Sequence, residues 1–469
     1  MSALFEAMNK TATTDNGCLA YHTSLSANLD FFYLAGASRG KNIKLEFKKA
    51  LAENPEIALR TLQWLRDIRG GAGERQLFRE LFKEYEESPQ GSLDELSKLV
   101  IKIPEVGRFD DLLWIVENCQ KAKPLAVGTF ILALSSVNGL AFKWTPIKGE
   151  VAKTLRKALG YKTEKDWRKF IVAGRKTVEQ QMCAKEWNEI EFSKVPSVAS
   201  ARYQKAFGRN AQEKYAAYLE SLQKGETTIN AAAVYPYDIY KSCFNGNAAV
   251  ANEQWKALPN YLEGSSERIL PMIDVSGSMS CPAGGNSKLS CMDVAISLGW
   301  YLSERIAGEF NRTFLTFESN VRMGKVQEGL SLVDVFRSIK QAPWGGNTDI
   351  HSAFNVLLQT AKQHNVQQDN MPTMIIILSD MQFDAYGNRG LTGFESIQEQ
   401  YEAAGYELPK IVFWNLNAAN KSIPVTKHQS GASMVSGFSP ALMKGILKGG
   451  MTPEQVMLDT IMVDRYKLN

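Results

Sequence analysis

Two carboxylates and three hydroxyls stand where apolar, strand-like runs of the chain end or a helix begins. An Asp-x-Ser-x-Ser string places Asp274, Ser276 and Ser278 directly after one apolar run. Thr348 precedes a helical pattern, and Asp380 closes a second apolar run. Carboxylate and hydroxyl oxygens are hard ligands, and they suit Mg²⁺, which keeps several waters and takes few carboxylates, better than zinc. The sequence therefore predicts a site for Mg²⁺ or another hard divalent cation.

The elements that must position these residues alternate in type after residue 265. Apolar runs at 268–274, 312–317, 373–379 and 410–414 indicate strands, and the patterns at 292–306 and 350–361 indicate helices. Continuous apolar strands that alternate with helices are typical of a parallel sheet covered on both faces. Such sheets bind ligands at the carboxyl ends of their strands, where the strand order reverses. The predicted oxygen ligands fall at these ends.

This arrangement resembles the metal-ion-dependent adhesion site (MIDAS) of von Willebrand factor A domains, a Rossmann-like α/β fold. The resemblance implies that Asp274, Ser276, Ser278, Thr348 and Asp380 are direct or water-mediated ligands of the cation. It also implies that the open coordination position takes a carboxylate from a partner. The alternative is that Asp-x-Ser-x-Ser forms only a turn or a helix cap.

The first 264 residues have a helical pattern. Apolar residues recur at helical spacing over 57–65 and 77–85, and no β-alternation is evident before residue 268. Helices separated by short breaks over this length favour a HEAT-like α-solenoid rather than one compact bundle. We therefore expect a multidomain chain, with an all-α helical-repeat domain at 1–264 and the A domain at 265–469.

The charge of the chain is unevenly distributed. Its net charge is only +4, but residues 121–215 hold 19 Lys and Arg against 8 Asp and Glu, which gives +11. Clustered cations with nearby aromatic residues such as Trp144 and Trp167 are what single-stranded RNA requires, although basic helix faces usually remain only solvated. The candidate nucleic-acid-binding residues are Lys143, Lys153, Arg156, Lys157, Arg168, Lys169, Arg175 and Lys176.

Further motifs of the helical part carry a second resemblance. They are the strings at 66–75 (RDIRGGAGER), 105–113 (EVGRFDDLL), 143–146 (KWTP), 182–190 (MCAKEWNEI) and 194–198 (KVPSV). They resemble an uncharacterised family of solenoid-plus-A-domain proteins whose architecture is similar to the TROVE proteins, the Ro autoantigen group. That likeness implies a ribonucleoprotein that binds small noncoding or structured RNA.

Several other functions are not supported by the sequence. No secretory signal is visible, and the uncharged stretch 124–142 is too polar for a preferred membrane span. Six scattered cysteines argue for a cytoplasmic protein, although a disulfide between Cys281 and Cys291 is possible. The Gly-x-Ser-x-Gly string at 36–40 lacks the context of a nucleophile, and no Lys follows the glycines at 70–73 as a nucleotide-binding loop requires. At most, those glycines place amides at a helix N-terminus near a phosphate, and a simple turn is the other interpretation.

We therefore expect a non-enzymatic RNA-binding protein whose basic helices bind RNA and whose metal site engages a second, acidic protein ligand. It needs no membrane and no nucleotide cofactor. The alternative is a metal-dependent protein-interaction or assembly module without RNA.

Overall fold

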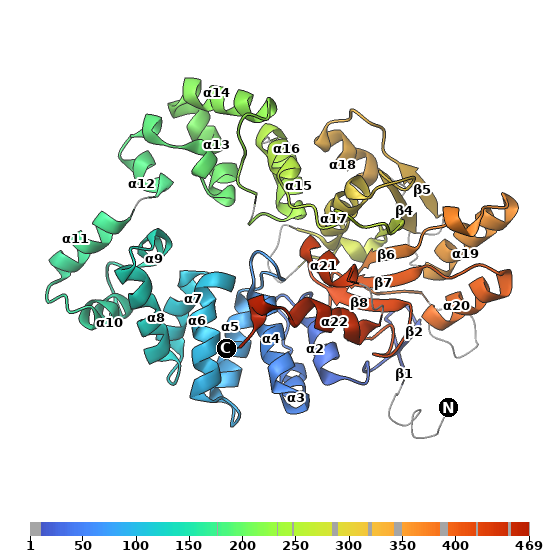
Figure 1. Ribbon diagram of the computed structural model, residues 1–469, viewed down its shortest axis with the longest axis horizontal. Coiled ribbons are helices and arrows are strands. Elements are labelled where there is room, and N and C mark those ends of the chain that lie inside the picture. The colour runs from blue at the N-terminus through green and yellow to red at the C-terminus, as the bar shows by residue number, and fades with distance from the viewer. Residues whose placement is uncertain are drawn as a thin grey trace. The chain divides into compact units, whose positions relative to one another are not determined.

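The computed structural model is shown in Figure 1. It describes residues 11–175, 177–231, 233–245, 248–283, 289–317, 321–341, 349–384, 393–418, 421–448 and 452–468. The chain forms two compact units. The sheet unit comprises Met1–Thr61, Tyr235–Ala248 and Asn260–Tyr466, and the helical unit comprises Leu62–Val234, Ala249–Pro259 and Lys467–Asn469. The domain boundary predicted between residues 264 and 265 is a division by sequence pattern. The compact units divide the chain at other residues.

The sheet unit is built on a six-stranded sheet in the order β5-β4-β3-β6-β7-β8. Its strands are β3 (Ile269–Asp274), β4 (Thr313–Phe317), β5 (Arg322–Lys325), β6 (Met374–Ser379), β7 (Lys410–Asn415) and β8 (Ala432–Ser436). Five of these strands are parallel, and β5 pairs antiparallel with β4 at one edge. The sheet is thus mixed, whereas the sequence predicted only four strands. The two missed strands, β5 and β8, lie at the edges of the sheet and have few large apolar residues, so no apolar run marks them in the sequence.

Helices cover both faces of the sheet, as the continuous apolar strands predict (Figure 1). The helices of this unit are α2 (Ala27–Ala35), α3 (Lys44–Glu53), α15 (Pro236–Phe244), α17 (Cys291–Arg305), α18 (Leu332–Lys340), α19 (Ile350–Gln363), α20 (Gly393–Ala404), α21 (Met443–Ile446) and α22 (Pro453–Ile461), together with the first part of α4 (Pro55–Arg66). The helix α17 packs closely on β3, because Gly299 has no side chain and an added Cβ would lie 2.5 Å from Ile273.

The N-terminal segment contributes to the sheet unit. A two-stranded antiparallel hairpin, β1 (Thr11–Thr13) with β2 (Leu19–Tyr21), precedes α2. The helix α2 contacts β8, and a Cβ on Gly36 would lie only 2.4 Å from the carbonyl oxygen of Ser436. The expectation of helices alone before residue 268 was therefore wrong for this hairpin. Strands of three residues are too short to show an alternating pattern.

The helical unit consists of helices joined mostly by short turns, with a longer connection at 184–196 (Figure 1). They are the end of α4, α5 (Gln76–Glu87), α6 (Leu93–Val106), α7 (Phe109–Asn118), α8 (Lys123–Ser135), α9 (Gly139–Trp144), α10 (Glu150–Ala158), α11 (Glu164–Gly174), α12 (Val178–Cys183), α13 (Ser197–Asn210), α14 (Gln212–Gln223) and most of α16 (Ala248–Lys256). The uncharged stretch 124–142 divides between α8 and α9. Over the described residues, no helix is both long and apolar enough to cross a membrane.

The order of the strands explains where a ligand can bind in the sheet unit. From β3 the chain continues to β4 on one side and later returns to β6 on the other side of β3. The carboxyl ends of β3 and β6 therefore flank the point at which the strand order reverses. In open parallel sheets this point carries the binding crevice.

Candidate functional site

Asp274 lies at the carboxyl end of β3 and has no exposed surface. One carboxylate oxygen accepts a hydrogen bond from the Ser276 backbone N–H at 2.9 Å, and the other accepts one from the Ser379 hydroxyl at 2.5 Å. Ser379 ends β6, so the parallel pairing of β3 with β6 brings it beside Asp274. The neighbouring strand thus fixes the orientation of this carboxylate.

Ser276 and Ser278 follow on the short loop after β3, and their hydroxyl oxygens are 3.0 Å apart. Asp380 follows β6 and is 3% exposed. The Ser278 hydroxyl lies close enough to the Asp380 carboxylate to lower its pKa. The next residue, Met381, has a φ of 64°, a left-handed backbone conformation that is uncommon for a residue with a side chain and that occurs often at functional sites. Four of the five predicted metal ligands therefore lie together at the predicted edge of the sheet.

The fifth predicted ligand, Thr348, lies outside the described residues. Within the described part of the chain, no group of three or more His, Cys, Asp or Glu side chains could hold a metal ion. The cluster at the ends of β3 and β6 contains two carboxylates, and its other oxygen donors are hydroxyls. The donors found here are nevertheless the hard oxygens that Mg²⁺ takes, so they fit such a cation.

The pKa values of the two carboxylates also favour a cation at this site. Burial, and then the nearby charge of Asp380, raises the pKa of Asp274 to about 7. Burial also raises the pKa of Asp380, while the Ser278 hydroxyl and the Lys41 ammonium act in the opposite direction. Two buried carboxylates this close repel each other when both are ionised. A divalent cation between them would relieve that repulsion.

The sequence did not indicate two further residues that lie beside this cluster, Lys41 and Asn417. Lys41 donates a hydrogen bond to the Asn417 side-chain oxygen, and burial lowers the pKa of Lys41. The Asn417 side-chain N–H in turn donates to Cys281 Sγ at 3.1 Å. Because Lys41 and Asn417 are far from the metal-site strings in sequence, only the fold could place them here.

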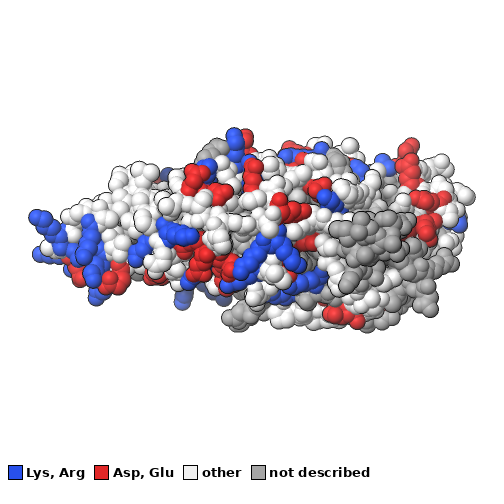
Figure 2. Space-filling view, turned by 90° about the horizontal axis from the view of Figure 1, so that it is seen from below, with Lys and Arg blue, Asp and Glu red and all other residues white. Residues whose placement is uncertain are grey.

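The predicted nucleic-acid-binding residues differ in whether their side chains have partners within the protein. Lys157, Arg168 and Lys169 are exposed, and no hydrogen bond or ion pair is found for their side chains among the described residues. In Figure 2, Lys and Arg side chains gather at the left end of the view, where Figure 1 shows α10 and α11. These three cations are available to an anionic ligand.

The other predicted cations have intramolecular partners. Lys143 pairs with Glu179 at 3.1 Å, and Lys153 pairs with Glu150 at 3.2 Å. The remaining partners are backbone carbonyl oxygens: those of residues 161 and 162 for Arg156, and those of residues 142 and 145 for Arg175. Lys176 lies outside the described residues.

The two tryptophans differ in exposure. Trp167 is fully buried and donates its indole N–H to the Pro146 carbonyl oxygen at 3.2 Å, whereas Trp144 is half-buried. The suggestion that Trp167 stacks on RNA bases was therefore wrong, because its ring packs in the interior against Tyr161 and Phe170.

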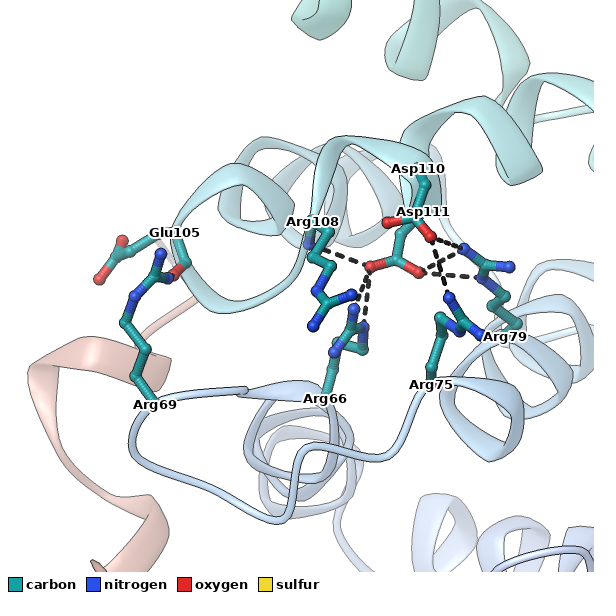
Figure 3. Close-up of polar contacts among 8 residues, drawn as sticks. All are labelled: Arg66, Arg69, Arg75, Arg79, Glu105, Arg108, Asp110 and Asp111. Carbon is teal, nitrogen blue, oxygen red and sulfur yellow. Dashed lines mark hydrogen bonds and ion pairs between the residues drawn. The ribbon is translucent and has the colours of Figure 1, made fainter. Parts of the chain in front are cut away.

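The strings at 66–75 and 105–113 meet in one polar network, drawn in Figure 3. Asp111 is fully buried, and both of its oxygens are paired. Arg66 approaches one oxygen at 2.7 and 2.8 Å, and Arg79 approaches the other at 2.8 and 2.9 Å. Asp110 pairs with Arg79 and with the more exposed Arg75. These motif residues thus join α4, α5 and α7, a structural role that the sequence did not reveal.

The glycine-containing strings at 36–40 and 70–73 have structural roles. The Gly71 position lies against the backbone, because an added Cβ would be 1.9 Å from the Trp64 carbonyl oxygen. The backbone N–H groups of Ala72 and Glu74 already donate to carbonyl oxygens at the end of α4, those of residues 64 and 65. The Ser38 hydroxyl is buried and donates to the Leu34 carbonyl oxygen at 2.8 Å, so it is not presented as a nucleophile.

Comparison with known families places the chain in a group defined by its N-terminal part. Residues 14–136 and 141–267 match the family described as "Domain of unknown function (DUF2828)", and these segments make up more than half of the chain. The chain therefore belongs to the DUF2828 family. Residues 269–466, which include the metal-site residues, match a second description, "Domain of unknown function (DUF7788)". The resemblance to an uncharacterised family is thus confirmed, and neither description names the A domain or the TROVE group.

The proteins similar to this chain include an uncharacterised relative and a protein of solved structure. Uncharacterized protein L728 of Acanthamoeba polyphaga mimivirus is 29% identical over an alignment that covers 98% of this chain and 89% of that protein. The crystal structure of the Deinococcus radiodurans Ro (RSR) protein aligns with 94% of this chain and 100% of that chain, at 14% identity and a TM-score of 0.46.

Proposed function

We propose that this protein is a non-enzymatic binding protein whose sheet unit holds Mg²⁺, or a similar hard divalent cation, in a MIDAS-like site. The observation that carries the proposal is the cluster of Asp274, Ser276, Ser278 and Asp380 at the point where the strand order reverses. Thr348, which precedes α19, would complete this set. A cation held by two carboxylates and by hydroxyls keeps coordination positions for other oxygen ligands.

The ligand that suits such an open position is a carboxylate from an acidic partner protein. A divalent cation with an unfilled coordination position is a Lewis acid, and it accepts an anionic oxygen as a further ligand. The cation supplies this attraction when it is bound, while Ser379 and the Ser276 backbone hold Asp274 in its orientation. The proposed activity is therefore cation-dependent recognition without catalysis.

Direct titration with Mg²⁺ and Mn²⁺ tests the metal site. We expect one site in the wild type and at least a roughly tenfold loss of affinity in Asp274→Asn, because one of the two charged ligands is removed. Asp334→Asn is the matched control, since Asp334 is an exposed carboxylate in the first turn of α18 in the same unit. Equal affinities for the wild type and Asp274→Asn, or no binding by the wild type, would contradict the proposal.

The recognition step requires a separate test with a defined probe. A set of acidic peptides, presented with Mg²⁺ or with a chelator, should bind the wild type only when the cation is present. Asp274→Asn should not bind these peptides under either condition. Peptide binding that is unchanged by the chelator would show that the cation does not take part in recognition.

RNA binding by α10 and α11 is a second candidate function, favoured by the three exposed cations Lys157, Arg168 and Lys169. Single-stranded RNA releases counterions when cations contact its phosphates, with a log–log salt slope of about −0.7 per contact. Replacing all three residues by Ala should therefore make the salt slope shallower by about 2 and weaken binding at low salt.

The control for the RNA experiment carries three substitutions elsewhere on the helical unit. Lys83, Lys98 and Lys224 are also accessible, but each pairs with an acidic residue one helical turn away. Their replacement by Ala should change the salt slope little. Asp274→Asn should leave RNA binding intact. If the α10–α11 variant binds structured and single-stranded RNA as the wild type does at every salt concentration, these helices are not the RNA site.

A further inference from the structure

Two cysteine side chains contact each other beside the candidate metal centre. Cys281 Sγ and Cys291 Sγ are 3.4 Å apart, and both residues are free thiols. The bond in a disulfide is about 2.05 Å long, so the two sulfurs touch but are not joined. Cation binding by hard oxygens does not require soft sulfur ligands. The proposed function therefore leaves this pair without a role.

The backbone holds the two residues opposite each other. The Cys291 N–H donates to the Cys281 carbonyl oxygen at 3.0 Å, and the Ala283 N–H donates to the Leu289 carbonyl oxygen at 2.8 Å. An antiparallel bridge joins Pro282 with Ser290 between these two hydrogen bonds. Residues that face each other across such a pair have Cβ atoms about 4.5–5.5 Å apart, close to the distance that a disulfide spans. Little backbone movement is needed to join the sulfurs.

The two thiols differ in their access to solvent. Cys281 is half-buried, and its sulfur accepts a hydrogen bond from the Asn417 side chain at 3.1 Å. Cys291 is the first residue of α17 and is fully buried. A small reagent can thus reach Cys281 first, while Cys291 lies behind it in contact with its sulfur. This is the arrangement of an attacking and a resolving thiol.

We propose that Cys281 and Cys291 form an oxidisable dithiol, a modification site whose oxidant is a low-molecular-weight disulfide such as oxidised glutathione. The Cys281 thiolate attacks one sulfur of the oxidant, forms a mixed disulfide and displaces one thiol. The Cys291 thiolate then attacks Cys281 Sγ, closes the intramolecular disulfide and displaces the second thiol. Two electrons pass from the cysteine pair to the oxidant, and the two protons end on the released thiols.

The modification would tether the loop that follows the candidate metal ligands. The Cys281 N–H donates to the Ser278 carbonyl oxygen at 3.0 Å, so a disulfide at Cys281 fixes the end of that loop to the start of α17. The inference does not rest on cation binding, because the thiol contact and the backbone pairing stand by themselves.

The test uses the full chain, incubated with mixtures of oxidised and reduced glutathione. Differential alkylation and peptide mapping then assign each cysteine. We expect an intramolecular disulfide that links Cys281 to Cys291, an intact mass lower by two hydrogens and complete reversal by dithiothreitol. The alkylation rate of Cys281 should fall by about tenfold or more after oxidation.

Two variants separate the roles of the thiols. Cys291→Ser should accumulate the mixed disulfide with glutathione at Cys281, whereas Cys281→Ser should leave Cys291 reduced. Cys183→Ser is the matched control, because Cys183 is exposed in the helical unit, and its loss should not affect the disulfide. Asp274→Asn should oxidise as the wild type does, so a failure of the metal proposal would be seen separately. If Cys281 and Cys291 both remain alkylatable, or if the wild type stops at the mixed disulfide, the proposal is wrong.

Discussion

The buried carboxylate of Asp111 offers a direct test of what holds the helical unit together. The side chains of Asp111 and Arg66 are 0% and 1% exposed, and the carboxylate also pairs with Arg79. Asp111→Asn removes the negative charge and leaves a buried guanidinium without its counter-charge. Breaking a buried ion pair in this way costs about 3–5 kcal/mol, because the remaining charge is neither solvated nor paired.

The matched control is Asp110→Asn in the adjacent residue. Asp110 is 14% exposed, and its partner Arg75 is 53% exposed, so solvent screens that contact. Its second partner, Arg79, retains the pairing with Asp111. We therefore expect Asp110→Asn to destabilise the unit by about 1 kcal/mol or less.

Native-state hydrogen exchange is the appropriate assay, since a chain with two compact units need not unfold in one step. Amides of α5, α6 and α7 should exchange roughly two to four orders of magnitude faster in Asp111→Asn than in the wild type. Adding Arg66→Met should recover part of the loss, because the orphaned cation is then removed. If Asp111→Asn and Asp110→Asn exchange at the same rate, the network does not act as the buried contacts indicate.

Two further predictions concern acid sensitivity and the glycine turn. Burial lowers the pKa of His351 to about 4, so between pH 6.5 and 4 the unfolded chain binds more protons than the folded chain, and stability falls as the pH falls. The loss between pH 7 and 4.5 should be about 2 kcal/mol smaller in His351→Gln than in the wild type in urea titrations. An equal loss in His351→Gln would refute this assignment. Gly71→Ala should destabilise the helical unit by about 1–3 kcal/mol, because its Cβ would clash with a backbone carbonyl oxygen. Gly128 lies inside α8, where an added Cβ meets no atom within 4 Å, so Gly128→Ala should be neutral or stabilise by up to about 1 kcal/mol. A lower melting temperature for Gly128→Ala than for Gly71→Ala would show that the turn at Gly71 is not tightly packed.

Local patterns in the sequence predicted the helix over 55–65. They also predicted the strands that end at Asp274 and before Asp380. Apolar periodicity and apolar runs are properties of neighbouring residues, and α4, β3 and β6 lie where these patterns indicate. The strand-end positions of the two aspartates followed from the same runs. The hairpin β1–β2 was not predictable in this way, because strands of three residues are too short to show an alternating pattern. The edge strand β8 has few large apolar residues and was missed for that reason.

The sequence by itself determined the types of oxygen ligand and the ends of the strands that carry them. Only the tertiary structure decided that β3 lies beside β6, that Ser379 orients Asp274 and that Cys281 faces Cys291. It also decided that Trp167 is buried and that Arg175 is bonded to carbonyl oxygens, while Lys157 remains exposed. The physical reason is that strand order, burial and the pairing of charges arise from contacts between different segments of the chain. A local string of residues specifies only which side chains a segment carries and which element it can form.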